Sequence, residues 1–571
     1  MKFSTPQLWS AFMPDQRRNI MIYVAGIMCY KFGIEYFNGA FLALANERFG
    51  EARYEKLGLL TGLNYAAQGI GSIAIAPLVK RMPIRIVLMG AIIAFGVVSA
   101  MIMIVDATTG GKIKFKTAND EVQYGSWNPN LMFPIFTFSG LSYGMVELIR
   151  RVIPRDIVGG DPARLKKMDG LVHVLYEVAG TIGALTSERL IDKFGYNYSS
   201  FLSPPLFFLA GAIWWFLDVE YDGKRASPTS SVELIKVDPE RSTLLQNWQK
   251  AFHGFVKAFY YGAWLCFTHR KFIWLIPSYT FALYGHRYLE NGVVQIYAKS
   301  VLGNSGLAQV IVGGSNLGEL LGAASVMLFT QAVPTPIPWL RMDAMTLNLI
   351  WIIPFFTTQG SANSRAWKLA PCMIPISYGW AGGDVSLAAY IQSTLSKLEQ
   401  EDDEVSALGA VMAFLYVTYI VLYSVLSTQL GRWIDKQLRD LQGDALVAKA
   451  QFALKMIGGV HFTVLSLIIF TATFIPRGAV ALNPKNIEQK VPGDPEKDDQ
   501  ERPVEDTSGP VTQLQLAPPT TYSREEFIAE PIQVYDHHPE HHSNPAYPSH
   551  ARQSENWVTN HHVRRMHPAD R

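Results

Sequence analysis

Cysteines and charged residues are both scarce in this sequence. Three cysteines in 571 residues, without pairing or metal-ligand spacing, exclude a disulfide scaffold. Charged residues make up only 17% of the chain, whereas soluble domains contain about 25%. The formal net charge of +2 excludes a strongly basic nucleic-acid-binding protein, and 49% hydrophobic residues exclude a disordered chain. This composition is typical of an integral membrane protein.

Long apolar segments account for the low charge. Twelve segments have about the 20 mostly apolar residues that a helix needs to cross a bilayer core about 30 Å thick. Those of the first half cover residues 20–44, 57–79, 84–105, 131–149, 170–190 and 199–217. Those of the second half cover residues 272–298, 306–330, 342–357, 366–392, 405–428 and 457–475. We predict an all-α membrane protein with twelve transmembrane helices in two six-helix bundles, residues 20–217 and 272–476.

Lysine and arginine residues predict the orientation, because they resist translocation across the membrane. The N-terminal segment 1–19 and the loop between the second and third helices carry three each. The loop between the fourth and fifth helices carries six, namely Arg150, Arg151, Arg155, Arg164, Lys166 and Lys167. We therefore place both termini in the cytoplasm. One connection does not fit this orientation, because it falls on the outer side although it is basic. It is the connection between the last two helices, with Arg432, Lys436, Arg439, Lys449 and Lys455.

Two polar regions flank the second bundle. The cytoplasmic linker 218–271 contains a stretch from Trp248 to Trp264 that mixes lysines with aromatic residues, and it is either an amphipathic helix on the membrane surface or an ordinary linker. Residues 477–571 are rich in proline, acids and histidine, which predicts a disordered cytoplasmic tail. A glycosylation sequon, Asn197-Tyr198-Ser199, lies on the predicted outer side, almost against the membrane.

Short motifs recur in the same order in the two halves. Tyr30-Lys31 through Glu35 recurs as His286-Arg287 through Glu290, and Asn64 with Gln68 recurs as Asn316 with Glu319. Ser142-Tyr143-Gly144 matches Ser377-Tyr378-Gly379. Leu175-Tyr176 and Ile191-Asp192-Lys193 match Leu415-Tyr416 and Ile434-Asp435-Lys436. The repeats indicate an internal duplication that makes the two bundles pseudo-symmetric.

Together these features resemble the major facilitator superfamily over residues 17–476. The family's loop signature Gly-x-x-x-Asp-Arg-x-Gly-Arg-Arg aligns with residues 76–85, where Arg81 and Arg85 match, while Lys80 replaces the acid and Pro83 a glycine. The run from Arg150 to Asp161 is similar to an uncharacterised group of fungal facilitators. The resemblance implies two parallel halves around an axis normal to the membrane and a central substrate site.

Acidic side chains outnumber permanent cations inside the predicted helices. We count the carboxylates Glu35, Glu147, Glu177, Glu290, Glu319 and Asp384, the cations Lys31 and Arg287, and the titratable His173 and His286. Ionised groups are costly at bilayer depth, so some of these acids must take up protons. We expect proton coupling through Glu35, Glu290 or Glu319, unless Glu319 and Asp384 lie close enough to the aqueous ends to stay hydrated.

Charged and polar side chains on several helices are the candidates for a central site. Lys31 with Glu35, and His286 with Arg287 and Glu290, either line an aqueous cavity at the midplane or form buried ion pairs that lock helices. Asn64, Gln68, Asn316, Tyr143 and Tyr378 suit an organic solute, although such residues also hold membrane helices together. Arg81, Arg85, Glu147, Arg150, His173 and Glu177 are expected to form a cytoplasmic gate or interfacial salt bridges.

The predicted function is secondary active transport of a small organic solute by alternating access. No Walker-type phosphate loop is present to hold ATP, no nucleophile or metal constellation indicates an enzyme, and we expect no cofactor. The alternatives are a non-transporting membrane sensor of the same fold and a cation or metal carrier. We expect a multi-pass monomer in the plasma membrane, with a small-molecule solute, protons and the lipid bilayer as partners, and no nucleic acid.

Overall fold

The described part of the chain is helical almost throughout. A computed structural model describes residues 12–79, 81–117, 121–158, 162–218, 244–329, 332–356, 360–395, 407–485 and 487. Most of the predicted N-terminal segment, much of the linker and the tail beyond residue 487 lie outside the described residues, as does Lys80 of the loop signature. Each of the twelve predicted spans coincides with a helical stretch.

The first bundle is made of five long helices and the shorter α7. They are α2 (Pro14–Arg48), α3 (Arg53–Val79), α4 (Ile84–Thr108), α5 (Met132–Val158), α6 (Pro162–Phe194) and α7 (Ser203–Trp215). At 1.5 Å per residue, the 35 residues of α2 extend over about 52 Å, so this helix projects beyond a bilayer core. Its aromatic residues pack in the core of the bundle, where Phe41 stacks on Phe136 of α5 with the ring centroids 4.7 Å apart.

The second bundle has more broken helices. Its elements are α9 (Arg270–Ile273), α10 (Ala282–Tyr288), α11 (Val294–Ile296), α12 (Ala308–Phe329), α13 (Ile337–Leu347), α14 (Ile352–Phe355), α15 (Ala362–Leu395), α16 (Ala407–Leu438), α17 (Gly443–Leu454) and α18 (His461–Ala472). The predicted seventh span contains three π-helical stretches, Ile276–Phe281, Leu289–Val293 and Tyr297–Val301. Such stretches are frequent at functional sites.

The helix bounds place the basic residues that do not fit the predicted orientation. Arg432 and Lys436 belong to α16, and Lys449 belongs to α17. The connection between these helices is therefore only the four residues 439–442. Basic residues in a short connection and in the adjoining helix turns count toward orientation, so these residues still oppose the orientation that the loops of the first half predict.

Glycines let the two bundles approach closely. A Cβ atom at Gly431 of α16 would lie 2.3 Å from the carbonyl oxygen of Tyr54 of α3, and one at Gly58 of α3 would lie 2.7 Å from the carbonyl carbon of Ser427. On α12, a Cβ atom at Gly313 would lie 2.4 Å from a side-chain carbon of Leu185 on α6. The bundles therefore meet along α3 with α16 and along α6 with α12.

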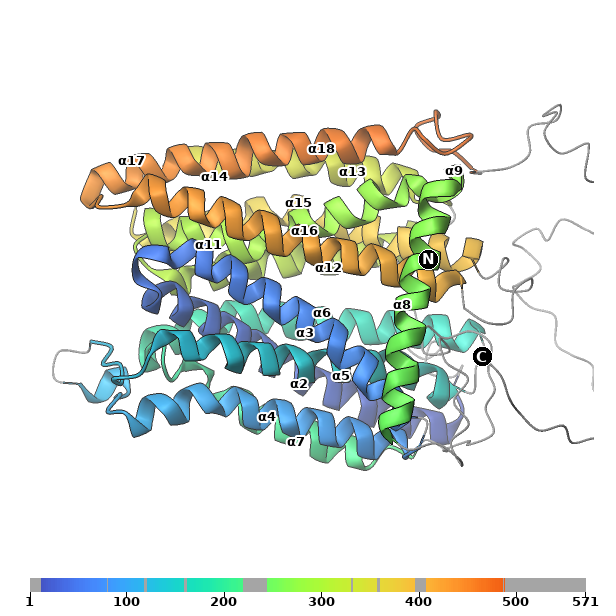
Figure 1. Cartoon of the computed structure of the whole chain (residues 1–571), viewed down its shortest axis with the longest axis horizontal. Helices are drawn as coiled ribbons and strands as arrows, with labels where there is room; N and C mark the ends of the chain where they lie inside the picture. Colours follow the sequence, from blue (N-terminus) through green and yellow to red (C-terminus); the bar gives the residue numbers. More distant parts are fainter. Residues whose placement is uncertain are drawn as a thin grey trace, which may run out of the picture. The chain divides into compact units, whose positions relative to one another are not determined.

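Two segments outside the bundles are held in place. Helix α8 (Leu244–Thr268), from the predicted linker, lies across one end of the other helices (Figure 1). The segment after α18 is bound by the buried Arg341 of α13, whose guanidinium donates to the carbonyl oxygens of Ala479 and Ala481. Residues 477–485 of the predicted tail therefore pack against the second bundle.

Candidate functional site

An ion pair on α2 faces α6 across the first bundle. The Lys31 amino group lies 2.7 Å from a carboxylate oxygen of Glu35, one turn later, and their side chains are 11% and 12% exposed. The lysine also lies 4.5 Å from the centroid of the Tyr176 ring on α6. Gly180, one turn after Tyr176, leaves room for Lys31, because a Cβ atom there would lie 2.4 Å from its Cε. Lys31 and Glu35 therefore form an ion pair within one turn of α2.

A second cation contacts the same tyrosine ring. The Arg150 guanidinium carbon of α5 lies 4.5 Å from the Tyr176 centroid, and Nη2 of Arg150 lies 2.7 Å from Glu147. Tyr30 of α2 donates its hydroxyl hydrogen to the other oxygen of Glu147 at 3.2 Å, and its ring stacks on Tyr143. Each cation therefore has its own carboxylate, and Tyr176 connects the two pairs.

The second half places a matching ion pair on its seventh span. Arg287 donates to Glu290 at 3.1 Å, and the other Glu290 oxygen accepts from Ser315 of α12 at 2.7 Å. The Arg287 side chain is 39% exposed. It also interacts electrostatically with groups on three other helices, namely Glu319 of α12, Tyr65 of α3 and Tyr419 of α16. Arg287 therefore faces the boundary between the halves.

Glu319 of α12 connects the charged groups of both halves. It interacts electrostatically with Glu290 and Arg287 of its own half and with Glu177 and Lys31 of the other half. Within the described residues, neither Glu319 nor Glu177 forms an ion pair, and one carboxylate oxygen of the buried Glu177 has no hydrogen-bond partner. Both carboxylates thus lie at the seam between the bundles, and no cation of the described residues pairs with either of them.

Asn316, one turn before Glu319, lies at the same seam. Its Nδ2 atom is buried without a hydrogen-bond partner among the described residues, and a Cβ atom at Gly180 of α6 would lie 3.5 Å from it. An amide donor that points at the opposite half without a partner is suited to a ligand atom.

At the predicted cytoplasmic ends of the helices, His173 of α6 interacts electrostatically with Asp384 of α15.

Other predicted site residues lie inside one bundle. His286 is only 3% exposed, contacts Asp343 of α13 at 2.9 Å and stacks on Trp380. Asn64 and Gln68 bind each other and tie α3 to α5, because Asn64 donates to the Phe136 carbonyl oxygen at 2.7 Å. These side chains hold helices together, which is the alternative that the sequence left open for polar residues in a membrane.

Three further predicted residues are also set apart from the seam. Tyr378 packs near Trp339 of α13. Arg85 is exposed at the start of α4, where it donates to the carbonyl oxygen of Leu217, and Arg81 lies in the turn before α4. Asp343, the partner of His286, was not among the residues predicted from the sequence. An acid in the ninth apolar segment was the available signal.

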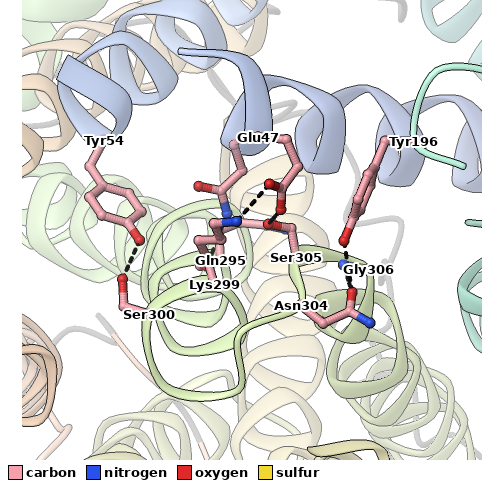
Figure 2. Close-up of polar contacts among 10 residues, drawn as sticks. Glu47, Tyr54, Tyr196, Gln295, Lys299, Ser300, Asn304, Ser305 and Gly306 are labelled. Carbon is pink, nitrogen blue, oxygen red and sulfur yellow. Dashed lines mark hydrogen bonds and ion pairs between the residues drawn. The ribbon is translucent and has the colours of Figure 1, made fainter. Parts of the chain in front are cut away.

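A polar network at the predicted outer end was also missed. Glu47 at the end of α2 binds Lys299 at 2.6 Å and accepts from Ser305 at 2.7 Å, and Tyr54 of α3 binds Ser300 at 2.6 Å (Figure 2). Tyr196, in the loop after α6, donates to Asn304 at 3.0 Å. Burial raises the pKa of Tyr196, and the negative charge of Glu47 adds to this, so the phenol stays a donor. These contacts join the two halves, and their residues lie just outside the predicted apolar segments.

Comparisons with known proteins agree with this architecture. Residues 23–422 match the model of the Major Facilitator Superfamily. A crystal structure of the nucleoside transporter NupG (D323A mutant) is 12% identical with a TM-score of 0.53, covering 80% of this chain and 99% of that one. Tetrameric PepTSo2 is 11% identical with a TM-score of 0.54, covering 80% and 97%. No curated protein matches the sequence significantly. None of these matches bears on the fungal resemblance.

Proposed function

Because the chain belongs to the Major Facilitator Superfamily, whose members are membrane transporters, we propose that it is a proton-coupled secondary transporter of a small organic solute. Its two halves alternate in exposing a site at their seam to either side of the membrane. The observation that carries the proposal is the position of Glu319, which interacts with Glu290 and Arg287 of one half and with Glu177 and Lys31 of the other.

Glu319 is the proposed proton carrier. Glu35 and Glu290 each form an ion pair with a cation within 3.1 Å. Glu319 faces two other carboxylates and has no ion pair among the described residues. A change in the distance between the halves would change the charge around Glu319, and with it the free energy of protonating this carboxyl group. Movement of the halves is thereby linked to proton uptake and release.

The solute site lies between Lys31, Arg287 and Asn316. Two cations and an amide donor that has no partner among the described residues can bind a carboxylate or another polar oxygen group, while the carboxylate of Glu177 can bind an amine. Structurally similar proteins are named as a nucleoside transporter and as proton-dependent oligopeptide transporters, which supports an organic solute. The same charge arrangement also gives the site a preference for solutes that carry both polar oxygen and amine groups.

Transport by purified protein tests the proposal. Nucleosides, dipeptides, sugars, amines and carboxylic acids are first screened for raising the melting temperature, because a ligand that binds only the folded protein stabilises it. The stabilising solute is then offered to proteoliposomes that contain a pH-sensitive dye. We expect uphill uptake driven by a pH gradient, with proton movement.

The variants separate coupling from binding. Glu319→Gln should abolish uphill uptake but retain exchange of labelled for unlabelled solute. Asp192→Asn is the matched control, since its side chain is 71% exposed at the end of α6, and it should behave like the parent protein. Uphill uptake that ignores both the pH gradient and Glu319→Gln would contradict proton coupling. Deletion of residues 488–571 should leave transport intact, whereas a sensor that signals through its tail would lose its output.

A further inference from the structure

Helix α8 contacts both halves of the protein through one face. The buried residues of this face are Asn247, Ala251, Ala258, Gly262, Leu265 and Cys266. Gly262 lies against the backbone of α16, because a Cβ atom there would be 2.0 Å from the Ala410 carbonyl oxygen. At the other end, the Trp248 indole donates to the carbonyl oxygen of Ala74 on α3 at 3.1 Å. The helix is thus fixed across the seam between the first and second bundles.

A row of large aromatic residues on α8 is left uncovered. Trp248, Phe252, Tyr260, Trp264 and Phe267 are between 44% and 68% exposed. At 3.6 residues per turn they spread over roughly 160° of the helix circumference, on the side away from most of its buried residues, and we call them the aromatic row. Five exposed aromatic rings in one row are far more than a water-facing helix normally carries. Some apolar medium must cover this side.

The same helix carries only positive charge. Its sequence contains Lys250 and Lys257 and no acidic residue, and both lysines are exposed. His253 is exposed between them, and Arg270 and Lys271 follow directly in α9. This charge is complementary to the anionic phospholipids that are enriched in the cytoplasmic leaflet.

The direction of α8 identifies the covering medium. The helix crosses the ends of the membrane-spanning helices rather than running along them (Figure 1). It is therefore parallel to the membrane plane, at the end that the basic loops predict to be cytoplasmic. Tryptophan and tyrosine prefer the boundary between headgroups and acyl chains, where an amphipathic helix with aromatic and lysine faces is stable.

We propose that α8 is a membrane-surface anchor that binds anionic phospholipid of the cytoplasmic leaflet. The aromatic row enters the boundary between headgroups and acyl chains, and Lys250 and Lys257 contact the lipid phosphates. The anchor does not depend on which solute the protein carries, or on proton coupling. Because α8 touches α3 and α16, which belong to different halves, bound lipid also holds the link between the halves at the membrane surface.

Spin-label accessibility in nanodiscs tests the position of the aromatic row. Single labels are placed at Phe252→Cys and Tyr260→Cys, in a chain whose three native cysteines are replaced by alanine. Asp192→Cys is the water-exposed control, because the Asp192 side chain is 71% exposed at the end of α6. Collisions with oxygen should exceed those with a water-soluble nickel complex several-fold at 252 and 260, and the order should reverse at 192. Equal access of the nickel complex to all three labels would overturn the proposal and indicate a water-exposed or protein-covered face.

Hydrogen exchange of the unmodified protein tests lipid specificity without any substitution. Nanodiscs of phosphatidylcholine are compared with nanodiscs that also contain phosphatidylserine. Exchange of residues 244–268 should slow several-fold with phosphatidylserine, and the double variant Lys250→Gln/Lys257→Gln should lose this difference. Exchange that is the same in both lipid mixtures would overturn the role of anionic lipid.

Discussion

The amino group of Lys299 lies 2.6 Å from a carboxylate oxygen of Glu47, and this ion pair joins the two halves at their predicted outer end. Glu47 ends α2 of the first bundle, whereas Lys299 lies in the last π-helical stretch of the seventh span. Their side chains are 16% and 22% exposed, so water screens the attraction only in part. We infer that the pair stabilises the conformation that is closed toward the outside.

Removal of this ion pair should favour the outward-open conformation. Glu47→Gln loses a charge-assisted contact of about 1.5–3 kcal/mol, which corresponds to a change of roughly 10- to 100-fold in the ratio of closed to open protein. Spin labels at the exposed positions Glu51 and Gln442 should move apart in distance measurements by electron spin resonance. Asp192→Asn breaks the Lys114–Asp192 pair within the first half and should leave that distance unchanged.

A methyl group at Gly431 should keep the outer ends apart. In Gly431→Ala the new Cβ would lie 2.3 Å from the Tyr54 carbonyl oxygen, and rigid backbone on both sides cannot give way easily. We expect a lower melting temperature and greater labelling of a cysteine at position 54 by a water-soluble reagent. Gly90→Ala is the control, because nothing lies within 4 Å of its Cβ, and alanine is favoured over glycine in a helix by about 0.5–1 kcal/mol. A result in which both variants behave alike would refute close packing at this seam.

The sequon at Asn197 should not be glycosylated. Asn197 is only 1% exposed and donates to a carboxylate oxygen of Asp106 at 2.7 Å. Glycosidase treatment of protein from a eukaryotic host should therefore leave its gel mobility unchanged. Ser199→Ala removes the sequon. It breaks no hydrogen bond, because the Ser199 hydroxyl has no partner among the described residues. Ser199→Ala should therefore change the free energy of unfolding little, whereas Asn197→Ala should lower it by about 1–3 kcal/mol. A mobility shift in Ser199→Ala would show that the site carries sugar.

His286 should prove structural and Glu319 functional. His286→Ala leaves Asp343, which is fully buried, without its 2.9 Å contact. A buried polar group left without its hydrogen-bond partner costs about 1–3 kcal/mol, so the melting temperature should fall. Protein that remains folded should still couple solute to protons. Glu319→Gln should melt close to the parent protein but lose coupling, and the reverse pattern would exchange the two roles.

The sequence predicted which charged residues pair within one helix, but it predicted only some of the contacts between helices. The pairs Lys31 with Glu35 and Arg287 with Glu290 lie one turn apart, so helical geometry alone brings their charges together. The sequence could not say which side of the helix each residue takes. His286 and Arg287 are neighbours in the chain, yet His286 points into its own bundle and Arg287 points to the seam.

The number and position of the apolar segments, and thus an all-helical membrane protein in two related halves, followed from the sequence by itself. Bilayer thickness sets segment length, and backbone groups in lipid must bond within their own helix, so composition suffices. Only the tertiary structure decided that Glu319 meets Glu177 and Lys31, and that Glu47 meets Lys299. These contacts depend on how far each helix is rotated and shifted against its neighbours, and side-chain packing across the two bundles determines this.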